Sequence, residues 1–437
     1  MRFLVGVAKK FATGRTSLGA LLQTGFSNVL IQGLYAVSGI ISARALGPSG
    51  RGMLAAIIMW PQFLSYLLTI GIPASSVYNV RRDPAHRSTY AAAAMAISAI
   101  MGSVAVLLGY LVIPYSLRTY PPAVVHMALL VVFLAPVALL TLSLTELARS
   151  SGIFGYYNFF RVAQPASVCV ALFLIWKLGG LTYWSGALVY LLAGIPFTVW
   201  NILWIRSHFR PSFKGGARPV RSLLNYGVRV WGADLLGTVA NQVDRVFVVS
   251  MLQPHDMGLY VVAQSAAGLM GVFPNAMAAV LMPRAAGHSV QEIVTLTGRA
   301  LRVAFAGLLL IALCLFFAGG FLLNLVYGSR FDGAFLVLRI LLAEGVLDGL
   351  TLVSSQAFLA AGIPGIVTFL HGCGLLTAVP LLLWMVPRWG LQGAAYALLI
   401  STACRLTFVL VSFRTTLKMP PPGIILKQSD IRSLMGH

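Results

Sequence analysis

Residues 303–323 read VAFAGLLLIALCLFFAGGFLL, which is 21 consecutive positions without a charged side chain. A helix that crosses a hydrocarbon core of about 30 Å needs about 20 apolar residues. Similar runs recur along the 437 residues, of which 59% are hydrophobic and only 9% are charged. Soluble domains carry about 25% charged residues. The composition therefore excludes a cytosolic enzyme, a secreted domain and a disordered chain, and it predicts a protein that crosses a membrane many times.

The same pattern predicts twelve membrane spans, six in each half of the chain. Each span must be a helix, because lipid cannot satisfy free backbone groups and the alternating ten-residue pattern of a barrel strand is absent. The spans are 19–42, 52–72, 90–113, 122–144, 158–177 and 181–205 in the first half, and 223–251, 257–282, 299–326, 333–361, 364–386 and 391–413 in the second. The predicted fold class is an all-α polytopic membrane protein.

The two halves of the chain resemble each other in sequence. Leu-Leu-Gln-Thr-Gly at 21–25 matches Leu-Leu-Asn-Tyr-Gly at 223–227, and Gly-Ile at 152–153 matches Gly-Ile at 362–363. Repeats of six spans run parallel and are related by an axis along the membrane normal. They predict two pseudo-symmetric six-helix bundles around a V-shaped central cavity. Chance similarity between independent helices is the alternative.

These features divide the chain into five predicted segments. They are a basic N-terminus at 1–18, an N-lobe at 19–205, a basic linker at 206–222, a C-lobe at 223–413 and a tail at 414–437. Of the 31 Lys and Arg residues, 21 fall on the side of the N-terminus, six on the other side and four within spans. The positive-inside rule therefore predicts that both termini are cytoplasmic.

The formal net charge of +21 is spread over short loops and forms no single basic face. This distribution of basic residues is better explained by membrane topology and by contact with anionic lipid than by binding to nucleic acid. Nucleic acid is therefore not predicted as a partner. The four cysteines contain no CxxC pair, so neither a disulfide framework nor a metal site is indicated. Motifs of catalysis and of nucleotide binding are absent, so neither an enzyme activity nor a cofactor is predicted. Any transport would be driven by an ion gradient or run downhill.

Eight charged residues lie in the interior of the predicted spans, all of them in the second half, whereas the first half has charges such as Arg161 only near its span ends. The eight are Arg229, Asp234, Asp244, Arg245, Arg339, Glu344, Asp348 and Arg405. A charge in the bilayer costs at least about 2.5–3.5 kcal/mol on insertion scales, so each is a functional candidate. Glu344 and Asp348 are four residues apart and share one helix face. Counting along the spans places them near mid-membrane, together with Asp234 and Arg405.

Two interpretations of these charges remain open. In the first, Asp234, Glu344 and Asp348 take up H⁺ or Na⁺ within a low-dielectric bundle and couple it to transport. In the second, the four acids and four arginines neutralise each other as structural pairs. Asp244 favours the second interpretation, because it lies beside Arg245 in the sequence.

Short motifs flank several of the predicted spans. They are Gly47-Pro48-Ser49-Gly50-Arg51-Gly52, Tyr157-Asn158 with Arg161, Asn241-Gln242-Val243-Asp244-Arg245, Gly258-Leu259-Tyr260 and Gly390-Leu391-Gln392-Gly393-Ala394-Ala395. Together with the twelve spans, they resemble the Wzx-type oligosaccharide flippases, polysaccharide biosynthesis proteins of the multidrug/oligosaccharidyl-lipid/polysaccharide exporter superfamily. The resemblance covers about residues 15–413. It implies movement of undecaprenyl-diphosphate-linked sugar units from the inner to the outer leaflet, coupled to H⁺ or Na⁺, through a cationic cavity between two lobes.

The resemblance also implies a site. Arginines would hold the lipid diphosphate, namely Arg161, Arg229, Arg245 and Arg405, since a guanidinium binds phosphate through two parallel hydrogen bonds. Carboxylates would bind the coupling ion, namely Asp234, Glu344 and Asp348. Arg161 and Arg229 lie near the predicted inner face, where an arginine that merely snorkels to the interface is the alternative. The implied partners are a lipid-linked oligosaccharide, membrane lipid, and the polysaccharide polymerase and chain-length machinery of a bacterial inner membrane.

Two other functions are considered. A cation-coupled multidrug efflux antiporter of the same superfamily shares the expected fold, with a second-lobe cation site on helices 7 and 10. That branch usually needs an acid in its first helix, whereas the first span here offers only Gln23, Asn28, Gln32 and Tyr35 as larger polar groups. A non-transporting scaffold for a polysaccharide assembly complex is the second alternative. The peptidoglycan-precursor flippases generally have two further helices, so that branch is disfavoured.

Overall fold

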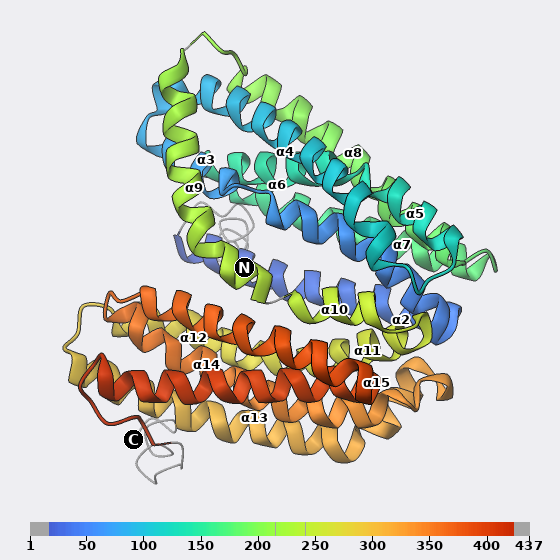
Figure 1. Cartoon of the computed structure of the whole chain (residues 1–437). Coiled ribbons are helices and arrows are strands. Elements are labelled where there is room, and N and C mark those ends of the chain that lie inside the picture. The colour runs from blue at the N-terminus through green and yellow to red at the C-terminus, as the bar shows by residue number, and fades with distance from the viewer. Residues whose placement is uncertain (1–16, 215, 241, 424–437) are drawn as a thin grey trace, which may run out of the picture. The chain divides into compact units, whose positions relative to one another are not determined.

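The computed structural model describes residues 17–214, 216–240 and 242–423, which form α-helices and short 3-10 turns without a β-strand (Figure 1). The prediction of an all-α fold is confirmed. Most of the predicted basic N-terminus, residues 1–16, and the end of the predicted tail, residues 424–437, lie outside the described residues.

By its contacts the chain divides into two compact units, residues 1–235 and 236–437. The first unit contains α2 (Ser17–Leu67), α3 (Ile72–Arg82), η1 (Pro84–His86), α4 (Arg87–Ser116), α5 (Pro122–Val132), α6 (Ala135–Ser150), α7 (Phe154–Lys177), α8 (Tyr183–Phe209) and most of α9 (Ala217–Ala240). The second contains α10 (Val243–Met251), α11 (Pro254–Ala267), η2 (Gly268–Gly271), α12 (Val272–Ala285), α13 (Val290–Tyr327), η3 (Ser329–Phe331), α14 (Ala334–Ala360) and α15 (Gly365–Thr415). The division falls inside the predicted span 223–251, and the predicted lobe boundaries stay a prediction.

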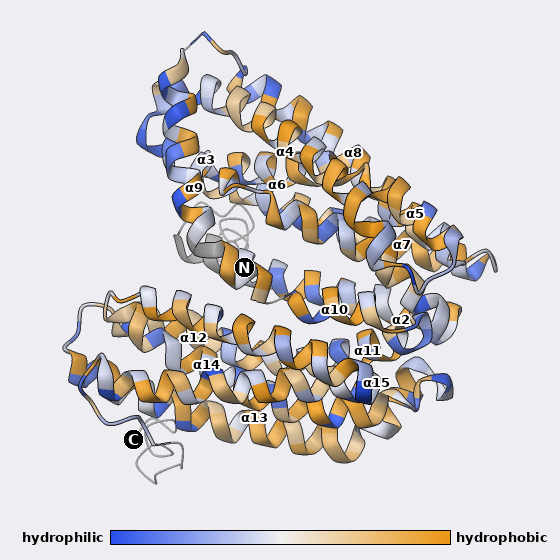
Figure 2. Cartoon of the chain, viewed as in Figure 1, coloured by the Kyte–Doolittle hydropathy of each residue, from blue (hydrophilic) through white to orange (hydrophobic). Residues whose placement is uncertain are grey.

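Hydrophobic residues predominate along most of the helices (Figure 2). Among the described residues, eight helical segments are long and apolar enough to cross a membrane. They coincide with ten of the twelve predicted spans, because the segments Gln23–Arg82 and Gly365–Thr415 each cover two spans. The predicted spans 223–251 and 333–361, which carry most of the intramembrane charges, are not among the eight. The chain is a multi-pass membrane protein, while the count of twelve spans stays a prediction.

Two helical runs, α2 and α15, are 51 residues long because each joins two helices across a kink. The kinks lie at Gly47, where φ is 67°, and at Gly390, where φ is 53°. Only glycine adopts such angles without steric cost. Each kink falls between two predicted spans, so the kinked runs agree with the predicted order of helices.

A further pair of glycines is equivalent in the predicted repeat. Gly152 and Gly362 both have positive φ, 78° and 75°. Each donates its N–H to a carbonyl three residues earlier, that of Arg149 at 3.1 Å and that of Leu359 at 3.1 Å. The two halves thus share a turn as well as a sequence match, which supports the predicted repeat.

Three predicted spans are interrupted in the structure, one of them, 257–282, by the 3-10 turn η2 between α11 and α12. Span 122–144 is divided between α5 and α6, and Pro136 lies in the first turn of α6. Proline lacks the N–H that would continue a helix, so the break is explained. The prediction of one continuous helix over 223–251 is wrong, because α9 ends at Ala240 and α10 begins at Val243.

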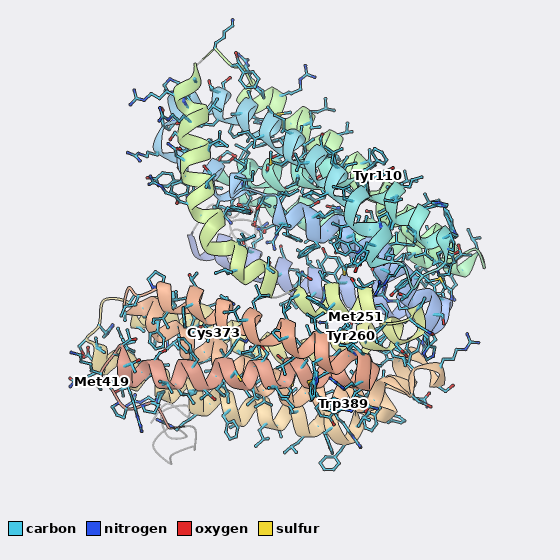
Figure 3. All side chains as sticks on the ribbon, in the orientation of Figure 1. Tyr110, Met251, Tyr260, Cys373, Trp389 and Met419 are labelled. Atoms are coloured by element: carbon cyan, nitrogen blue, oxygen red, sulfur yellow. The ribbon has the colours of Figure 1, made fainter. Side chains whose placement is uncertain are left out.

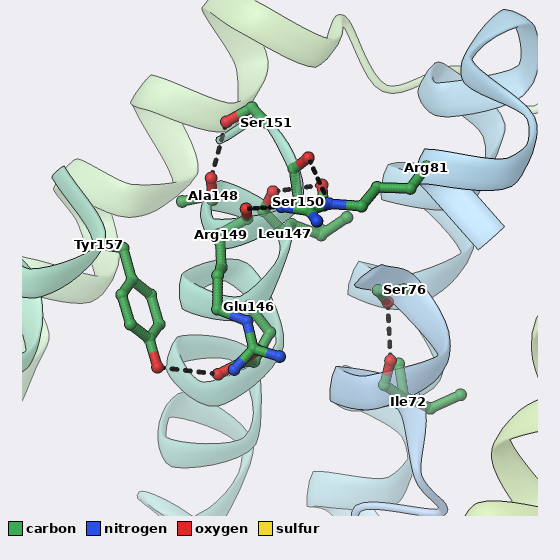
Figure 4. A network of polar contacts seen from close by, with 10 residues as sticks. All are labelled: Ile72, Ser76, Arg81, Glu146, Leu147, Ala148, Arg149, Ser150, Ser151 and Tyr157. Carbon is green, nitrogen blue, oxygen red and sulfur yellow. Dashed lines mark hydrogen bonds and ion pairs between the residues drawn. The ribbon is translucent and has the colours of Figure 1, made fainter. Parts of the chain in front are cut away.

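The basic helix ends of the first unit lie together. At the end of α3, Arg81 donates to the carbonyl oxygens of Arg149 and Ser150 at the end of α6, both at 3.4 Å (Figure 4). At the start of α4, Ser88 donates to the carbonyl of Arg210, which follows α8, at 2.5 Å. The segments that the sequence predicts on one side of the membrane are therefore gathered at one end of this unit.

Candidate functional site

The second unit contains a cavity of about 260 Å³ that is lined mainly by α10, α11, η2, α12, α14 and α15. Three carboxylates line it, those of Asp244, Glu344 and Asp348, together with the guanidinium of Arg405. We call this the acidic cavity. Glu344 and Asp348 come from α14, as their shared helix face predicts, and Arg405 comes from the second part of α15.

A chain of polar contacts connects α14 to α15 in the acidic cavity. The hydroxyl of Thr402 donates to Oε1 of Glu344 at 2.8 Å. Nη2 of Arg405 forms an ion pair with Oδ1 of Asp348 at 2.8 Å and also donates to Oγ1 of Thr402 at 3.0 Å. The side chain of Asp348 is 51% exposed and that of Arg405 is 15% exposed, so the carboxylate is the more accessible partner. Thr402 carries no charge, so the pattern of intramembrane charges did not point to it.

Gly374 makes room for the Arg405 side chain. A Cβ atom at position 374 would lie 2.5 Å from Cδ of Arg405 and 3.2 Å from its Cγ. The carbonyl of Gly374 also accepts a hydrogen bond from Ser401 at 2.9 Å, which fixes the two parts of α15 against each other. A larger residue at position 374 would therefore push Arg405 away from Asp348.

We expect Gly374→Ala to destabilise the protein by about 1–3 kcal/mol, the usual cost of overpacking a close contact. The matched control is Gly372→Ala in the same helix, because a Cβ there meets nothing within 4 Å. Thermal unfolding of the two purified variants in one detergent measures the difference. Equal melting temperatures would show that Arg405 does not depend on the space at Gly374.

Asp244 is held by α11. Its side chain is buried, with the residue 5% exposed. It accepts hydrogen bonds from the hydroxyl of Tyr260 (labelled in Figure 3) at 2.8 Å and from Nε2 of Gln264 at 2.7 Å. Nε of Arg245 donates to Oε1 of the same Gln264 at 2.7 Å. These contacts favour a structural role for Asp244. Asp244 and Arg245 do not pair directly, because each hydrogen-bonds to the side chain of Gln264 instead.

The other charges of the second half are not all neutralised by each other. The guanidinium of Arg339 lies over the rings of Phe316 and Phe335, at 4.5 and 4.1 Å from their centroids. Asp234 belongs to α9, but its side chain lies outside the described residues. Among the described side chains of the eight predicted residues, Arg405 and Asp348 form the one direct ion pair.

In the first unit, Arg161 lies where α7 packs on α2. Its Nη2 donates to Oδ1 of Asn28 at 2.7 Å, and its guanidinium lies 5.2 Å from the ring centroid of Tyr157. The Tyr157 hydroxyl in turn donates to Glu146 at 3.4 Å, and Glu146 pairs with Arg149 at 3.1 Å (Figure 4). Arg161 therefore has neutral partners of its own beside a neighbouring ion pair.

A second cavity, of about 540 Å³, lies between α3 and α9 of the first unit. Helix α3 contributes Tyr78, Asn79 and Arg82. Helix α9 contributes Arg218, Arg221, Ser222, Asn225, Tyr226 and Arg229. We call this the arginine pocket, after its four guanidiniums.

The arginine pocket contains one predicted site residue, Arg229. The three other arginines were counted only as loop charges in the sequence. A signal was present, because positions 218, 221, 222, 225 and 229 follow each other at spacings that place them on one face of a helix. The structure does not bring Arg161 into this pocket, and Arg245 and Arg405 belong to the second unit.

Comparisons with known proteins agree with this architecture. A family model described as polysaccharide biosynthesis protein matches residues 21–287. A probable low-salt glycan biosynthesis flippase, Agl15 of Haloferax volcanii, is 25% identical over 262 residues, which are 56% of this chain and 53% of the relative. The match thus spans about half the length of that relative.

Solved structures share the fold at low sequence identity. Lipid II flippase MurJ in an inward closed conformation has a TM-score of 0.74 at 15% identity, covering 92% of this chain and 88% of that one. A multidrug resistance MATE family transporter of the MOP superfamily, inward-facing, has a TM-score of 0.72 at 16% identity, covering 89% and 94%. The likeness shows the fold, and the family model covers more than half of the sequence. The chain belongs to the polysaccharide biosynthesis protein family.

Proposed function

We propose that this protein is a flippase that moves an undecaprenyl-diphosphate-linked oligosaccharide from the inner to the outer leaflet, coupled to H⁺ or Na⁺. The proposal includes a bacterial inner membrane, cytoplasmic termini, and work beside the polysaccharide polymerase and chain-length machinery. Its family and the curated relative described as a glycan biosynthesis flippase support the class of cargo.

The acidic cavity is the observation that carries the coupling part of the proposal. It is lined by three carboxylates and one guanidinium, so it has a formal excess of two negative charges when all are ionised. Such an excess is costly inside a membrane protein. Uptake of a proton or of Na⁺ offsets this cost, and the affinity of the cavity for a cation is the physical basis of coupling.

The contacts in the cavity suggest how the ion acts. A cation that binds between Glu344 and Asp348 competes with Arg405 for the Asp348 carboxylate. Because Arg405 and Thr402 belong to α15 and the carboxylates to α14, the occupied and empty cavities hold the two helices differently. Preferential binding of the ion to one arrangement shifts the population toward it, as alternating access requires.

Complementation tests the cargo. In a bacterial strain that lacks its own oligosaccharide flippase, expression of this protein is expected to restore surface polysaccharide, measured by gel electrophoresis of the extracted glycan. Folded protein in the membrane without restored polysaccharide, in strains with several different glycans, would contradict the proposal. The vector alone and an unrelated multi-pass transporter are the controls.

An efflux antiporter for small organic cations is a second candidate. The acidic cavity favours it, because excess negative charge also attracts cationic drugs, and the fold is shared with a multidrug transporter. Dye efflux from whole cells distinguishes the two candidates. The flippase proposal expects no faster efflux of a cationic dye than in cells with the empty vector.

A further inference from the structure

The arginine pocket is an open hollow whose two walls are held together by direct contacts. The rings of Tyr78 and Tyr226 stack with centroids 4.1 Å apart and planes 5° from parallel. The Ser222 hydroxyl donates to Oδ1 of Asn79 at 2.8 Å. These contacts fix α9 against α3 along the length of the pocket, so the guanidiniums that line it are presented by two rigid elements.

Close contacts also join α9 to α3 and to the end of α2. The Ser75 hydroxyl donates to the carbonyl of Leu223 at 2.6 Å, and the indole N–H of Trp231 donates to the carbonyl of Leu67 at 2.8 Å. A Cβ at Gly71 would lie 2.2 Å from the carbonyl oxygen of Gly227. The position of α9 is therefore tied to the end of α2 and to α3 between Leu223 and Trp231, the stretch that carries Arg229.

The charge of the pocket is not balanced by the protein around it. No carboxylate is among the described residues that line it. Arg82 donates to the Tyr78 hydroxyl at 2.9 Å. Arg218, Arg221 and Arg229 make no ion pair or hydrogen bond with another described residue. The nearby Asp83 pairs with His86 at 2.8 Å. Guanidiniums that surround one cavity repel each other, so an anion inside it is stabilised.

The residue types specify which anion fits. Arginine binds phosphate through paired N–H donors, and the free N–H groups at the start of a helix such as α9 also favour phosphate. The volume of about 540 Å³ falls within the range of small-molecule sites and exceeds the needs of a single inorganic ion. A diphosphate together with part of its attached group fits such a space.

The position of the pocket in the first unit indicates that the anion enters from the membrane surface. It lies at the basic helix ends, where Figure 2 shows hydrophilic residues at the end of α3 and the start of α9. The segment Pro84–Ser116, which follows the end of α3 directly, is apolar enough to cross a membrane. A headgroup at the membrane surface can therefore enter the pocket while its hydrocarbon tail stays in the lipid.

We propose that the arginine pocket binds the phosphate-bearing headgroup of a lipid at the membrane surface, before any passage through the protein. If the headgroup is the diphosphate of the lipid-linked oligosaccharide, the inference rests on the proposed function. An ordinary anionic phospholipid shares the same chemistry. The pocket is separate from the acidic cavity, which lies in the other unit.

Binding of farnesyl diphosphate to the full chain tests the proposal. The purified protein is placed in nanodiscs of phosphatidylcholine, which carry no net charge, and binding of the radiolabelled probe is measured. The double variant Arg221→Gln, Arg229→Gln is expected to weaken binding about tenfold or more, equivalent to about 1.4 kcal/mol. The control double variant Arg87→Gln, Arg206→Gln removes the same charge from the same end of the unit, outside the pocket, and is expected to weaken binding by less than about twofold.

The outcomes separate the explanations. Equal weakening in both double variants, or no binding to the native protein in phosphatidylcholine, overturns the proposal. Nanodiscs that contain phosphatidylglycerol identify the source: displacement of the probe assigns the pocket to ordinary phospholipid headgroups, and retention assigns it to the diphosphate carrier. Equal thermal unfolding of the two variants confirms that both are folded.

Two results separate the pocket from the proposed function. A protein that binds the probe but restores no glycan refutes the proposed function alone. Normal probe binding by the pocket variant refutes only the pocket.

Discussion

Glu344→Gln is expected to lower glycan export by about 5–150-fold, the range that corresponds to a coupling free energy of about 1–3 kcal/mol. The substituted amide keeps the shape of the side chain, and its oxygen still accepts the hydrogen bond from Thr402. The change therefore removes charge from the acidic cavity with little effect on packing. Export that remains should no longer depend on the ion gradient.

The measurement is surface polysaccharide in the complemented strain, with and without an agent that collapses the proton or the sodium gradient. The matched control is Glu292→Gln in the same unit. Glu292 is exposed, and its carboxylate accepts hydrogen bonds from Ser289 at the start of α13, a helix that contributes no residue to the lining of the cavity. If Glu344→Gln retains full, gradient-dependent export, Glu344 has no part in coupling.

Gly71→Ala is expected to have the largest effect on stability. At Gly71 φ is 63°, which costs an alanine about 1–2 kcal/mol. In addition, the new Cβ would lie 2.2 Å from the carbonyl oxygen of Gly227, a backbone atom that cannot rotate away. The two effects together should destabilise the first unit by more than about 3 kcal/mol, because α9 must move off α3.

Gly152→Ala separates the two contributions. Gly152 also has positive φ, 78°, but a Cβ there meets nothing within 4 Å. It therefore carries the backbone cost without the clash. Thermal unfolding monitored by size-exclusion chromatography should show a clearly larger loss for Gly71→Ala, together with a lower yield of folded protein. Similar losses in both variants would mean that α9 does not press on α3 at Gly71.

Much of the fold follows from local sequence. Runs of about 20 apolar residues identify helices regardless of their partners, which is why ten predicted spans coincide with apolar helical segments. Glycine and proline mark some of the breaks, as at Gly47 and Pro136. The break between Ala240 and Val243 has no comparable marker within the described residues, and the sequence pattern alone predicted an unbroken helix there.

The candidate site was only partly predictable, because its contacts join residues far apart in the chain. The shared face of Glu344 and Asp348 depends on helix geometry and could be predicted. The ion pair between Asp348 and Arg405 spans 57 residues and depends on how α14 packs on α15. Asp244 and Arg245 are neighbours in sequence, but adjacent helix positions do not face each other. Their shared partner, Gln264, could be found only from the structure.

The equivalent glycine turns at Gly152 and Gly362 bear on the evolution of the chain. A turn that recurs with nearly the same φ at residues 152 and 362 is most simply inherited from one ancestral six-helix unit that duplicated and fused. After such a fusion, the twin copies were free to diverge under separate selection. The two halves then diverged in their bilayer charges, which are concentrated in the second half, while the glycine turn was retained in both. Chimeras that exchange the two glycine turns are therefore expected to fold.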